Sequence, residues 1–317
     1  MMTECERFVA EGVLPEDFFK EEVRCDFLVT TERKKVWAVE LDMLSQVDAV
    51  CRKHGLRYCL VFGSLLGAVR HHGFIPWDDD LDIALPRKDY EKLLALKDEF
   101  SSPYFLQTPY TDSGFYFSFA KLRNCRTTEA NYPFLYQEFN SGICIDFFPL
   151  DDVVKEGARE RFDQINKLVL DNSTAMRATH PALSPRDQER VKNYTGKDPI
   201  STYEEIQKLA NPRENVNSDV VSTFVNTVYS FDRSMWKKED FSSLIEWDFE
   251  GLRTYIPIGY DRILTTIYGN YHSFPSVEER GQHGNTRFYP DVPYDVMIDK
   301  IKAEIGDRYP SDWCKRL

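Results

Sequence analysis

Helix-like and strand-like patterns alternate through the first third of the chain. Apolar residues recur at helical spacing between Thr31 and Gly55, and a glycine at the end of such a pattern is typical of a helix C-cap. A short apolar run over residues 58–62 leads into Gly63 and Ser64, after which the apolar spacing again becomes helical. The pattern predicts a helix, a buried strand, a tight turn and the start of a second helix.

A strand with regularly spaced carboxylates is predicted next. It begins near Pro76 and carries Asp78, Asp80 and Asp82, while Asp79 and apolar residues occupy the alternate positions. Because successive side chains of a strand point to opposite faces, the three carboxylates would share one face at intervals of about 7 Å.

Three carboxylates on one face repel one another unless a cation lies among them. The sequence holds no Lys or Arg between Arg70 and Arg87, which leaves a metal ion as the predicted counter-charge, and oxygen ligands favour Mg²⁺ or Mn²⁺. An EF-hand calcium loop is a weaker alternative, because its sixth and twelfth positions would be Ile83 and Asp89 instead of Gly and Glu. A solvated acidic edge strand is disfavoured by the apolar residues that alternate with the carboxylates.

A helix and two further strands complete the predicted core. Residues 87–100 have the spacing of an amphipathic helix, and the alternation over residues 115–123 is typical of a strand. Residues 142–148 form an apolar run with a single charge, Asp146. Such a charge is costly unless it is paired or binds a metal, so Asp146 is predicted to join the carboxylates of the acidic strand. An Asp that caps a turn is the alternative.

The remainder of the chain is more polar. Helices are predicted over residues 159–170, 203–209, 261–268 and 294–305, with short strand character at residues 255–258. We expect an α+β fold in three parts: an N-terminal lead-in (1–30), a catalytic core (31–155) and a helical C-terminal part packed on that core (156–317).

Composition and charge narrow the class of protein. The 317 residues are 42% hydrophobic and 14% aromatic, which is typical of a globular protein with a substantial core. A net charge of −12 disfavours nucleic-acid binding and a polybasic membrane patch. The seven cysteines are scattered without a CxxC pair, and neither a signal peptide nor a membrane-spanning apolar run is evident. These features predict a cytoplasmic protein with at most peripheral membrane contact.

The motifs combine into a candidate site for phosphoryl transfer. The turn at Gly63 and Ser64, at the start of a helix, offers backbone N–H groups and a hydroxyl to a phosphate. Nearby carboxylates would hold Mg²⁺ against that phosphate, and one carboxylate would accept the proton of an attacking hydroxyl. The candidates to neutralise the remaining phosphate charge are Arg70, Lys121 and Arg123.

The order of these motifs resembles the LicD family of phosphotransferases. The central stretch, GSLLGAVRHHGFIPWDDDLDIALPRKDYEKL, is similar to that family's signature, and FAKLRNCRTT, GICIDFFPLDDV, FEGL and YDRILTTIYGNY follow in the family's order. The resemblance runs from about Trp37 to His283. Two positions depart from the family pattern: His72 stands where the family has Gly, and Asn270 stands where it has Asp.

The resemblance implies a nucleotidyltransferase-like fold, which is a small mixed sheet flanked by helices. It also implies that Gly63 and Ser64 bind phosphate, that Asp80 and Asp82 are the metal-binding pair of the catalytic site, and that Asp146 is the third acidic residue of that metal site. The basic pair expected to close over the nucleotide is Arg280 and His283, and the candidates for the donor pocket are Trp77 and Asp78.

Members of the family move phosphocholine from CDP-choline to a sugar of a lipopolysaccharide, teichoic acid or glycan, and animal relatives transfer ribitol phosphate from CDP-ribitol. The resemblance therefore implies a CDP-activated alcohol as donor, with CDP-choline favoured, and a carbohydrate acceptor. A nucleotidyltransferase and a non-catalytic nucleotide- or glycan-binding protein are the alternatives. Choline would favour an aromatic surface, for which the candidates are Trp77, Tyr116, Tyr132 and Phe134.

Overall fold

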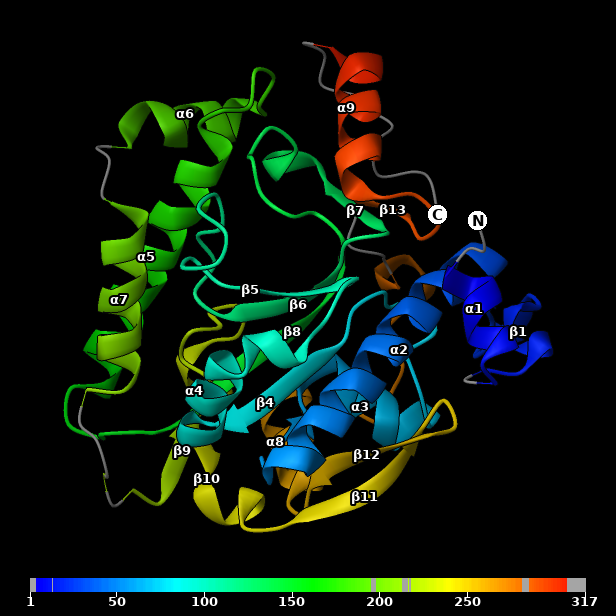
Figure 1. The fold of residues 1–317 in the computed structure, drawn as a ribbon. Helices are drawn as coiled ribbons and strands as arrows, with labels where there is room; N and C mark the ends of the chain where they lie inside the picture. Colours follow the sequence, from blue (N-terminus) through cyan, green and yellow to red (C-terminus); the bar gives the residue numbers. More distant parts are fainter. Residues whose placement is uncertain are drawn as a thin grey trace.

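The computed structural model describes residues 4–12, 14–194, 198–212, 216, 218–280 and 285–306 (Figure 1). Its α-helices are α1 Glu4–Ala10, α2 Thr31–His54, α3 Phe62–His71, α4 Arg87–Ala95, α5 Ala158–Arg177, α6 Pro185–Asn193, α7 Pro199–Ala210, α8 Tyr260–Tyr268 and α9 Tyr294–Ile305. The predicted helices are present; α5 and α7 are longer than expected, and α6 has no counterpart among the predictions. Within the described ranges, none of the helices has both the length and the apolar character that crossing a membrane requires.

The strands are short, apart from the ten-residue β8. They are β1 Glu22–Arg24, β2 Phe27–Val29, β3 Cys59–Leu60, β4 Asp82–Pro86, β5 Tyr104–Gln107, β6 Ala120–Asn124, β7 Thr128–Asn131, β8 Ile143–Asp152, β9 Val220–Ser222, β10 Trp236–Lys237, β11 Leu244–Phe249, β12 Leu252–Pro257 and β13 Thr286–Tyr289.

A mixed sheet forms the centre of the molecule (Figure 1). In the described part of the chain it has seven strands in the order β10-β9-β8-β4-β3, and β6 extends it from β8 to β5. β4 and β8 are parallel, whereas the other neighbouring strands are antiparallel. The mixed α+β class predicted from the sequence is therefore confirmed.

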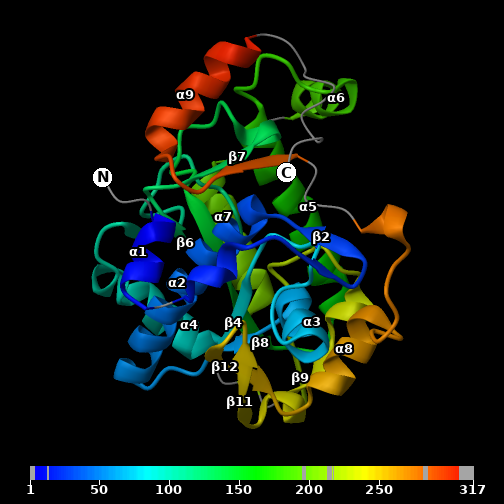
Figure 2. The same cartoon turned by 90° about the vertical axis from the view of Figure 1, so that its right-hand side faces the viewer.

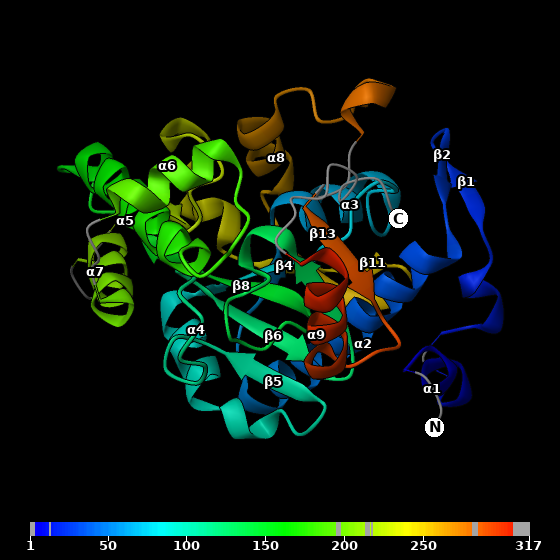
Figure 3. The same ribbon diagram turned by 90° about the horizontal axis from the view of Figure 1, so that it is seen from above.

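Helices and hairpins surround this sheet. α2 packs against β8 and α4 packs against β4, while α3 packs against α8 (Figure 2). Figure 3 shows α5, α6 and α7 grouped at one side of the sheet and the β1–β2 hairpin at the opposite side. β9 and β10 come from residues after 155, so the C-terminal part contributes strands to the central sheet as well as helices.

Local signals at both ends explain the long helix α2. The Thr30 hydroxyl accepts a hydrogen bond from the Arg33 N–H at 3.2 Å, and Gly55 ends the helix with a left-handed φ of 63°. The apolar stripe of α2 joins the main hydrophobic core, which also contains the strand residues Leu60, Ile83, Ile145 and Phe147. The core thus holds α2 against the strands that carry the candidate site.

The predicted acidic strand is wrong in its first half. β4 begins at Asp82, not near Pro76, and a turn closed by the hydrogen bond from the Asp78 N–H to the Ile75 carbonyl (2.8 Å) precedes it. The acidic residues before Asp82 therefore lie in a loop. The apolar residues that alternate with them were compatible with a strand, but contacts from α2 hold this segment in a different conformation.

The predicted strand from residue 115 is also wrong in its first half, since β6 begins only at Ala120. The rings of Phe115 and Phe117 pack against each other with centroids 5.1 Å apart, and those of Phe117 and Phe119 lie 5.9 Å apart. Neighbouring positions of one face in a strand would separate these rings by about 7 Å. The alternating rings therefore reflect aromatic packing in an irregular segment.

The β11–β12 hairpin contains the FEGL sequence and fixes the segment that follows α3. Glu250, at the turn of the hairpin, accepts hydrogen bonds from the Arg24 guanidinium at 2.5 and 3.2 Å and from the Phe74 N–H at 3.2 Å. The Glu250 N–H donates to the His72 carbonyl at 2.9 Å. These contacts anchor the chain between α3 and the acidic loop.

Glu250→Gln is expected to lower the free energy of unfolding by about 2–3 kcal/mol, because it removes the buried charge that pairs with Arg24. The matched control is Glu246→Gln in β11, whose half-exposed carboxylate lies 3.5 Å from Arg52 and should contribute less than about 1 kcal/mol. Urea-induced unfolding of both variants measures the difference. Equal losses would contradict an anchoring role for Glu250.

Candidate active site

Asp82 and Asp146 lie side by side on the central sheet. They are register partners in the parallel pair β4–β8, so both side chains leave the same face, on strands about 4.8 Å apart. Lys121 of β6 is the register partner of Asp146 on its other side, and its Nζ lies 2.7 Å from Asp146 Oδ1. Burial alone would lower the pKa of Lys121, but the negative groups around it, of which Asp146 contributes most, together raise that pKa. The charge in the apolar strand is therefore paired.

The loop before β4 is held by the side of α2. The carbonyl of Asp78 accepts hydrogen bonds from the Arg33 guanidinium at 2.7 Å and from the Trp37 indole N–H at 3.0 Å. The same guanidinium lies 3.7 Å from the carboxylate of Asp79, and both side chains are almost fully buried. Arg33 of α2 thus places a positive charge next to the acidic loop. The spacing of residues in the sequence did not indicate this contact.

Asp80 and Asp82 are close enough to affect each other's ionisation. Burial raises the pKa of Asp80 well above its ordinary value, and the charges of Asp78 and Asp82 raise it further. The structure therefore brings Asp80, Asp82 and Asp146 to one region, although Asp80 reaches it from a loop instead of a strand.

The first turn of α3 touches the acidic residues directly. A Cβ on Gly63 would lie 2.9 Å from Asp78 Oδ2, so the absence of a side chain allows that carboxylate to approach the turn. The Ser64 hydroxyl accepts a hydrogen bond from the Asp82 N–H at 2.8 Å. This bond ties the start of α3 to the start of β4. Phosphate binding by Gly63 and Ser64 stays a prediction.

Ser64→Ala is expected to lower the free energy of unfolding by about 1–2 kcal/mol, because the Asp82 N–H loses its acceptor in a buried site. It should also slow catalysis several-fold by loosening Asp82. The control is Ser45→Ala, whose hydroxyl bonds to the carbonyl of Asp42 within the same helix, α2. Urea unfolding measures the loss of stability, and initial rates measure the loss of activity. If Ser64→Ala and Ser45→Ala show the same stability and the same rate, Ser64 does not hold Asp82 in place.

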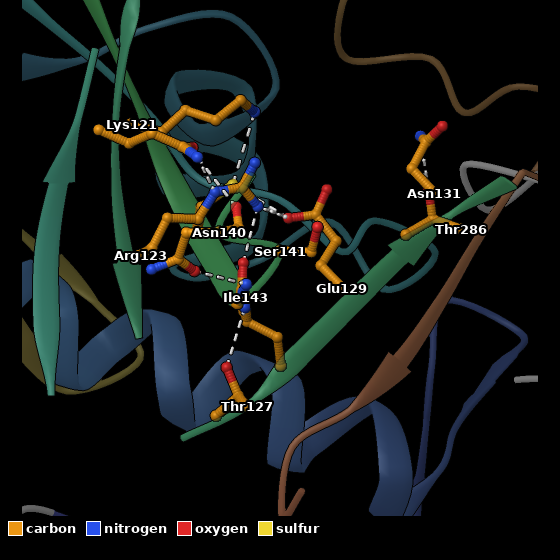
Figure 4. A network of polar contacts seen from close by, with 12 residues as sticks. Lys121, Arg123, Thr127, Glu129, Asn131, Asn140, Ser141, Ile143 and Thr286 are labelled. Atoms are coloured by element: carbon orange, nitrogen blue, oxygen red, sulfur yellow. Dashed lines mark hydrogen bonds and ion pairs between the residues drawn. The ribbon is translucent and has the colours of Figure 1, made fainter. Parts of the chain in front are cut away.

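Arg123 lies in a buried polar network next to Lys121 (Figure 4). Its guanidinium donates to the Glu129 carboxylate at 2.6 Å, to the Gly142 carbonyl at 2.7 Å and to Gln107 Oε1 at 2.8 Å. Burial would raise the pKa of Glu129, but the charges of Arg123 and Lys121 lower it, so Glu129 stays ionised. Of the two predicted phosphate-binding residues on β6, Lys121 contacts Asp146, whereas Arg123 contacts Glu129.

The other predicted basic residues lie around α3 and the segment after α8. Arg70 donates to two backbone carbonyls of that segment, at 2.8 and 3.2 Å. Arg280 donates to the Cys25 carbonyl at 2.6 Å, and its guanidinium lies 4.7 Å from the ring centroid of Trp77. His283 falls outside the described residues. Trp77 packs against Phe274, whereas Phe134 packs against Phe117, so these two choline candidates belong to different aromatic clusters.

Two buried charged residues of α2 were missed by sequence reasoning, Arg33 and Glu40. Glu40 is 1% exposed. Burial raises its pKa well above the ordinary value, and the charges of Asp79 and Asp78 raise it further. Glu40 of α2 therefore lies close enough to the acidic loop for the charges of Asp79 and Asp78 to affect it. A signal existed: Glu40 interrupts the mostly apolar run of residues 36–44, VWAVELDML.

The chemistry of this region suits a hard cation. Among the described residues, no three His, Cys, Asp or Glu side chains are arranged as a ready-made metal site. Mg²⁺, however, commonly binds through only one or two carboxylates, with water and substrate phosphates supplying its other ligands. Asp80 and Asp82 supply two such oxygen donors. Besides burial, which is the largest cause, the charges of Asp78 and Asp82 raise the pKa of Asp80, and a cation would offset that repulsion. The residues present therefore fit Mg²⁺ or Mn²⁺.

Comparison with protein families places this site in a known domain. Residues 55–193 match the family described as LicD/FKTN/FKRP, nucleotidyltransferase domain. The matched segment contains α3, the acidic loop, β4, β6 and β8, and therefore every contact around Asp82 and Asp146 described above. The resemblance seen in the sequence is confirmed.

Individual relatives extend the likeness beyond this domain. The chain is 27% identical over 265 residues to the lipopolysaccharide cholinephosphotransferase LicD of Haemophilus influenzae, which covers 77% of this chain and 92% of that protein. An uncharacterised protein of Rickettsia prowazekii is 38% identical over 71 residues, 22% of this chain and 25% of its own. An uncharacterised protein of Rickettsia typhi is 43% identical over 47 residues, 15% of each chain.

Proposed function

We propose that this protein transfers phosphocholine from CDP-choline to a sugar hydroxyl of a cell-surface glycan such as lipopolysaccharide or teichoic acid, with Mg²⁺ or Mn²⁺ as cofactor. The observation that carries the proposal is the pairing of Asp82 with Asp146 beside the first turn of α3, within a LicD-type domain. The printed function of the Haemophilus influenzae relative supports phosphocholine as the group transferred. The chain is thus an enzyme, a LicD-type phosphotransferase.

The residues divide the work between binding and proton transfer. Asp80 and Asp82 would hold the metal ion, which would supply positive charge to the phosphate oxygens. Asp146, whose carboxylate contacts Lys121 at 2.7 Å, accepts the proton of the acceptor hydroxyl. The acceptor oxygen forms a bond to the phosphorus that carries choline, and the bond from that phosphorus to the CMP oxygen breaks, so CMP leaves with the electron pair. The N–H groups of the first turn of α3 favour an anion at this place.

The leading alternative is a nucleotidyltransferase that keeps the nucleotide on its product, and a non-catalytic binding protein is the other. The first would use the same residues and differ in which phosphorus is attacked. The second is disfavoured by the presence of Asp80, Asp82 and Asp146 together. We propose a cytoplasmic reaction, since CDP-activated donors are made there, with peripheral contact to a membrane where the acceptor is lipid-linked.

The test is calorimetric titration with CDP-choline, CDP-ribitol, CDP-glycerol and CTP, each with and without Mg²⁺, followed by product analysis. We expect CDP-choline to bind. When a lipopolysaccharide lacking phosphocholine is added, CMP should be released and phosphocholine should become attached to the lipopolysaccharide. Pyrophosphate released from CTP would support the nucleotidyltransferase instead. Binding without any turnover would support the non-catalytic alternative.

Removal of the metal is expected to slow CMP release by at least about a hundredfold, because the phosphate charge would no longer be neutralised. EDTA-treated enzyme is compared with the same sample after excess Mg²⁺ or Mn²⁺ is added, which should restore the rate. Circular dichroism of both samples checks that the fold is unchanged. Full activity in EDTA would contradict the assignment of Asp80 and Asp82 as metal ligands.

A further inference from the structure

Two tyrosine hydroxyls from outside the matched domain are hydrogen-bonded to each other. Tyr229 lies in the segment between β9 and β10, and Tyr268 is the last residue of α8. Their oxygens are 2.8 Å apart, and their rings meet edge to face with centroids 5.9 Å apart. Both side chains are partly buried and pack against the main hydrophobic core. Sequence reasoning assigned neither residue a role, because nothing in the sequence places them together.

The pair lies against the first turn of α3. The ring of Tyr229 stacks on that of Phe62, the first residue of α3, with centroids 5.3 Å apart and an interplanar angle of 25°. Phe62 has a left-handed φ of 50°, which is unusual for a bulky residue and persists only where the surroundings hold it. α8, which carries Tyr268, packs against α3 (Figure 2). Both tyrosines are therefore held next to the turn that contains Gly63 and Ser64.

Both hydroxyls keep their protons at neutral pH. Burial raises the pKa of Tyr229 to about 12, and three carboxylate charges contribute to the rise, those of Asp82, Asp78 and Asp80. Burial also raises the pKa of Tyr268 well above its ordinary value, with further contributions from Tyr229, Asp82 and Asp78. The pair is thus close enough to the acidic residues for their charges to act on it, and it remains a hydrogen-bond donor.

The pair has one more proton than its mutual hydrogen bond uses. Each phenol carries one O–H group, and the bond between the two oxygens takes one of the two protons. In the part of the chain that the structure describes, neither hydroxyl has a further hydrogen-bond partner. The second proton is therefore available to an acceptor on a ligand.

We propose that the hydroxyl pair of Tyr229 and Tyr268 donates its second hydrogen bond to a phosphate oxygen of the nucleotide donor. The inference rests on the proposed function, which places a diphosphate beside Asp80 and Asp82. A hydrogen bond from a hydroxyl to a charged phosphate oxygen is stronger than one between two neutral groups. Because the contacts with α3 fix the pair, the bond stays oriented while negative charge moves toward the leaving CMP.

The other end of the donor, the trimethylammonium of choline, fits this pair less well. Aromatic rings attract such a cation, but one face of the Tyr229 ring is already covered by Phe62. The group of the pair that is not yet used is a phenolic proton. A trimethylammonium has no hydrogen-bond acceptor and carries positive charge, so it cannot use that proton, whereas a phosphate oxygen can.

The probe is CDP, which has the diphosphate but no choline, compared with cytidine by calorimetric titration in the presence of Mg²⁺. We expect one of the variants Tyr229→Phe and Tyr268→Phe to weaken CDP by about tenfold to a hundredfold and to leave cytidine unchanged. The double variant should weaken CDP no further, because the pair provides one outgoing hydrogen bond. The matched control is Tyr271→Phe, which loses a bond of 2.7 Å to Asp261 and should bind CDP as the wild type does.

Wild-type affinity for CDP in the double variant would overturn the proposal, and so would an equal loss of CDP and cytidine. If Tyr268→Phe keeps CDP-choline binding and Tyr268→Leu alone abolishes it, the rings bind choline and the proposal is wrong. Circular dichroism checks the fold, and unfolding of both Phe variants would assign the pair a purely structural role.

Turnover of CDP-choline distinguishes the two levels of inference. CDP binding that depends on the hydroxyl pair, in a protein that transfers no phosphocholine, rejects the proposed function and leaves the phosphate contact standing. Transfer of phosphocholine at the wild-type rate by the double Phe variant rejects the phosphate contact alone.

Discussion

Asp82→Asn is expected to slow CMP release from CDP-choline by at least about a hundredfold while the protein stays folded. The substitution keeps the size of the side chain and removes the charge that we propose binds the cation beside Asp146. Because Asp82 also raises the pKa of Asp80 through repulsion, removing its charge should leave the thermal midpoint of unfolding unchanged or slightly higher. Initial rates with saturating Mg²⁺ and a thermal scan measure both quantities.

The matched control is Asp98→Asn, which removes one charge from a side chain that is 91% exposed and far along the chain from the sheet face. Its rate should equal that of the wild type. If Asp82→Asn retains more than about a tenth of the activity, the carboxylate is not a metal ligand. If it instead loses activity together with its fold, the residue is structural.

Arg33→Met is expected to lower the free energy of unfolding by about 3–5 kcal/mol. The guanidinium is 2% exposed and faces the equally buried Asp79, so its removal leaves an uncompensated charge in the interior. It also removes the hydrogen bond to the Asp78 carbonyl that holds the acidic loop. Urea unfolding measures the loss, and activity should fall as the loop that carries Asp80 is released.

The double variant Arg33→Met/Asp79→Leu tests the cause of this loss. Replacing both charges by apolar side chains should recover most of the stability, because the penalty comes from the single buried charge left behind. Lys35→Met on the same helix is the control, since its ion pairs with Glu32 and Asp291 are partly exposed and should contribute less than about 1 kcal/mol. A double variant as unstable as Arg33→Met would assign the loss to packing instead.

Helices were the most predictable part of the fold. α2 follows from its apolar spacing and its two caps, and α3, α4, α8 and α9 follow from comparable local patterns. Strand starts were less predictable, as β4 and β6 show, because alternation in sequence is compatible with turns and with aromatic packing. The pairing of β1 with β2 and of β7 with β13 was not predicted. These strands are short, and no local sequence pattern indicates which strand each one pairs with.

The sequence by itself determined which residues are the candidates for the chemistry: GSLL at the start of α3, the acidic stretch ending at Asp82, and a lone Asp146 in an apolar strand. These are local features, and the family likeness rests on them. Only the tertiary structure decided how they meet. The parallel register of β4 and β8 places Asp82 beside Asp146, and α2 and β6 bring Arg33 and Lys121 to the carboxylates. The reason is physical: a buried charge needs a partner in space, and sequence distance does not restrict where that partner comes from.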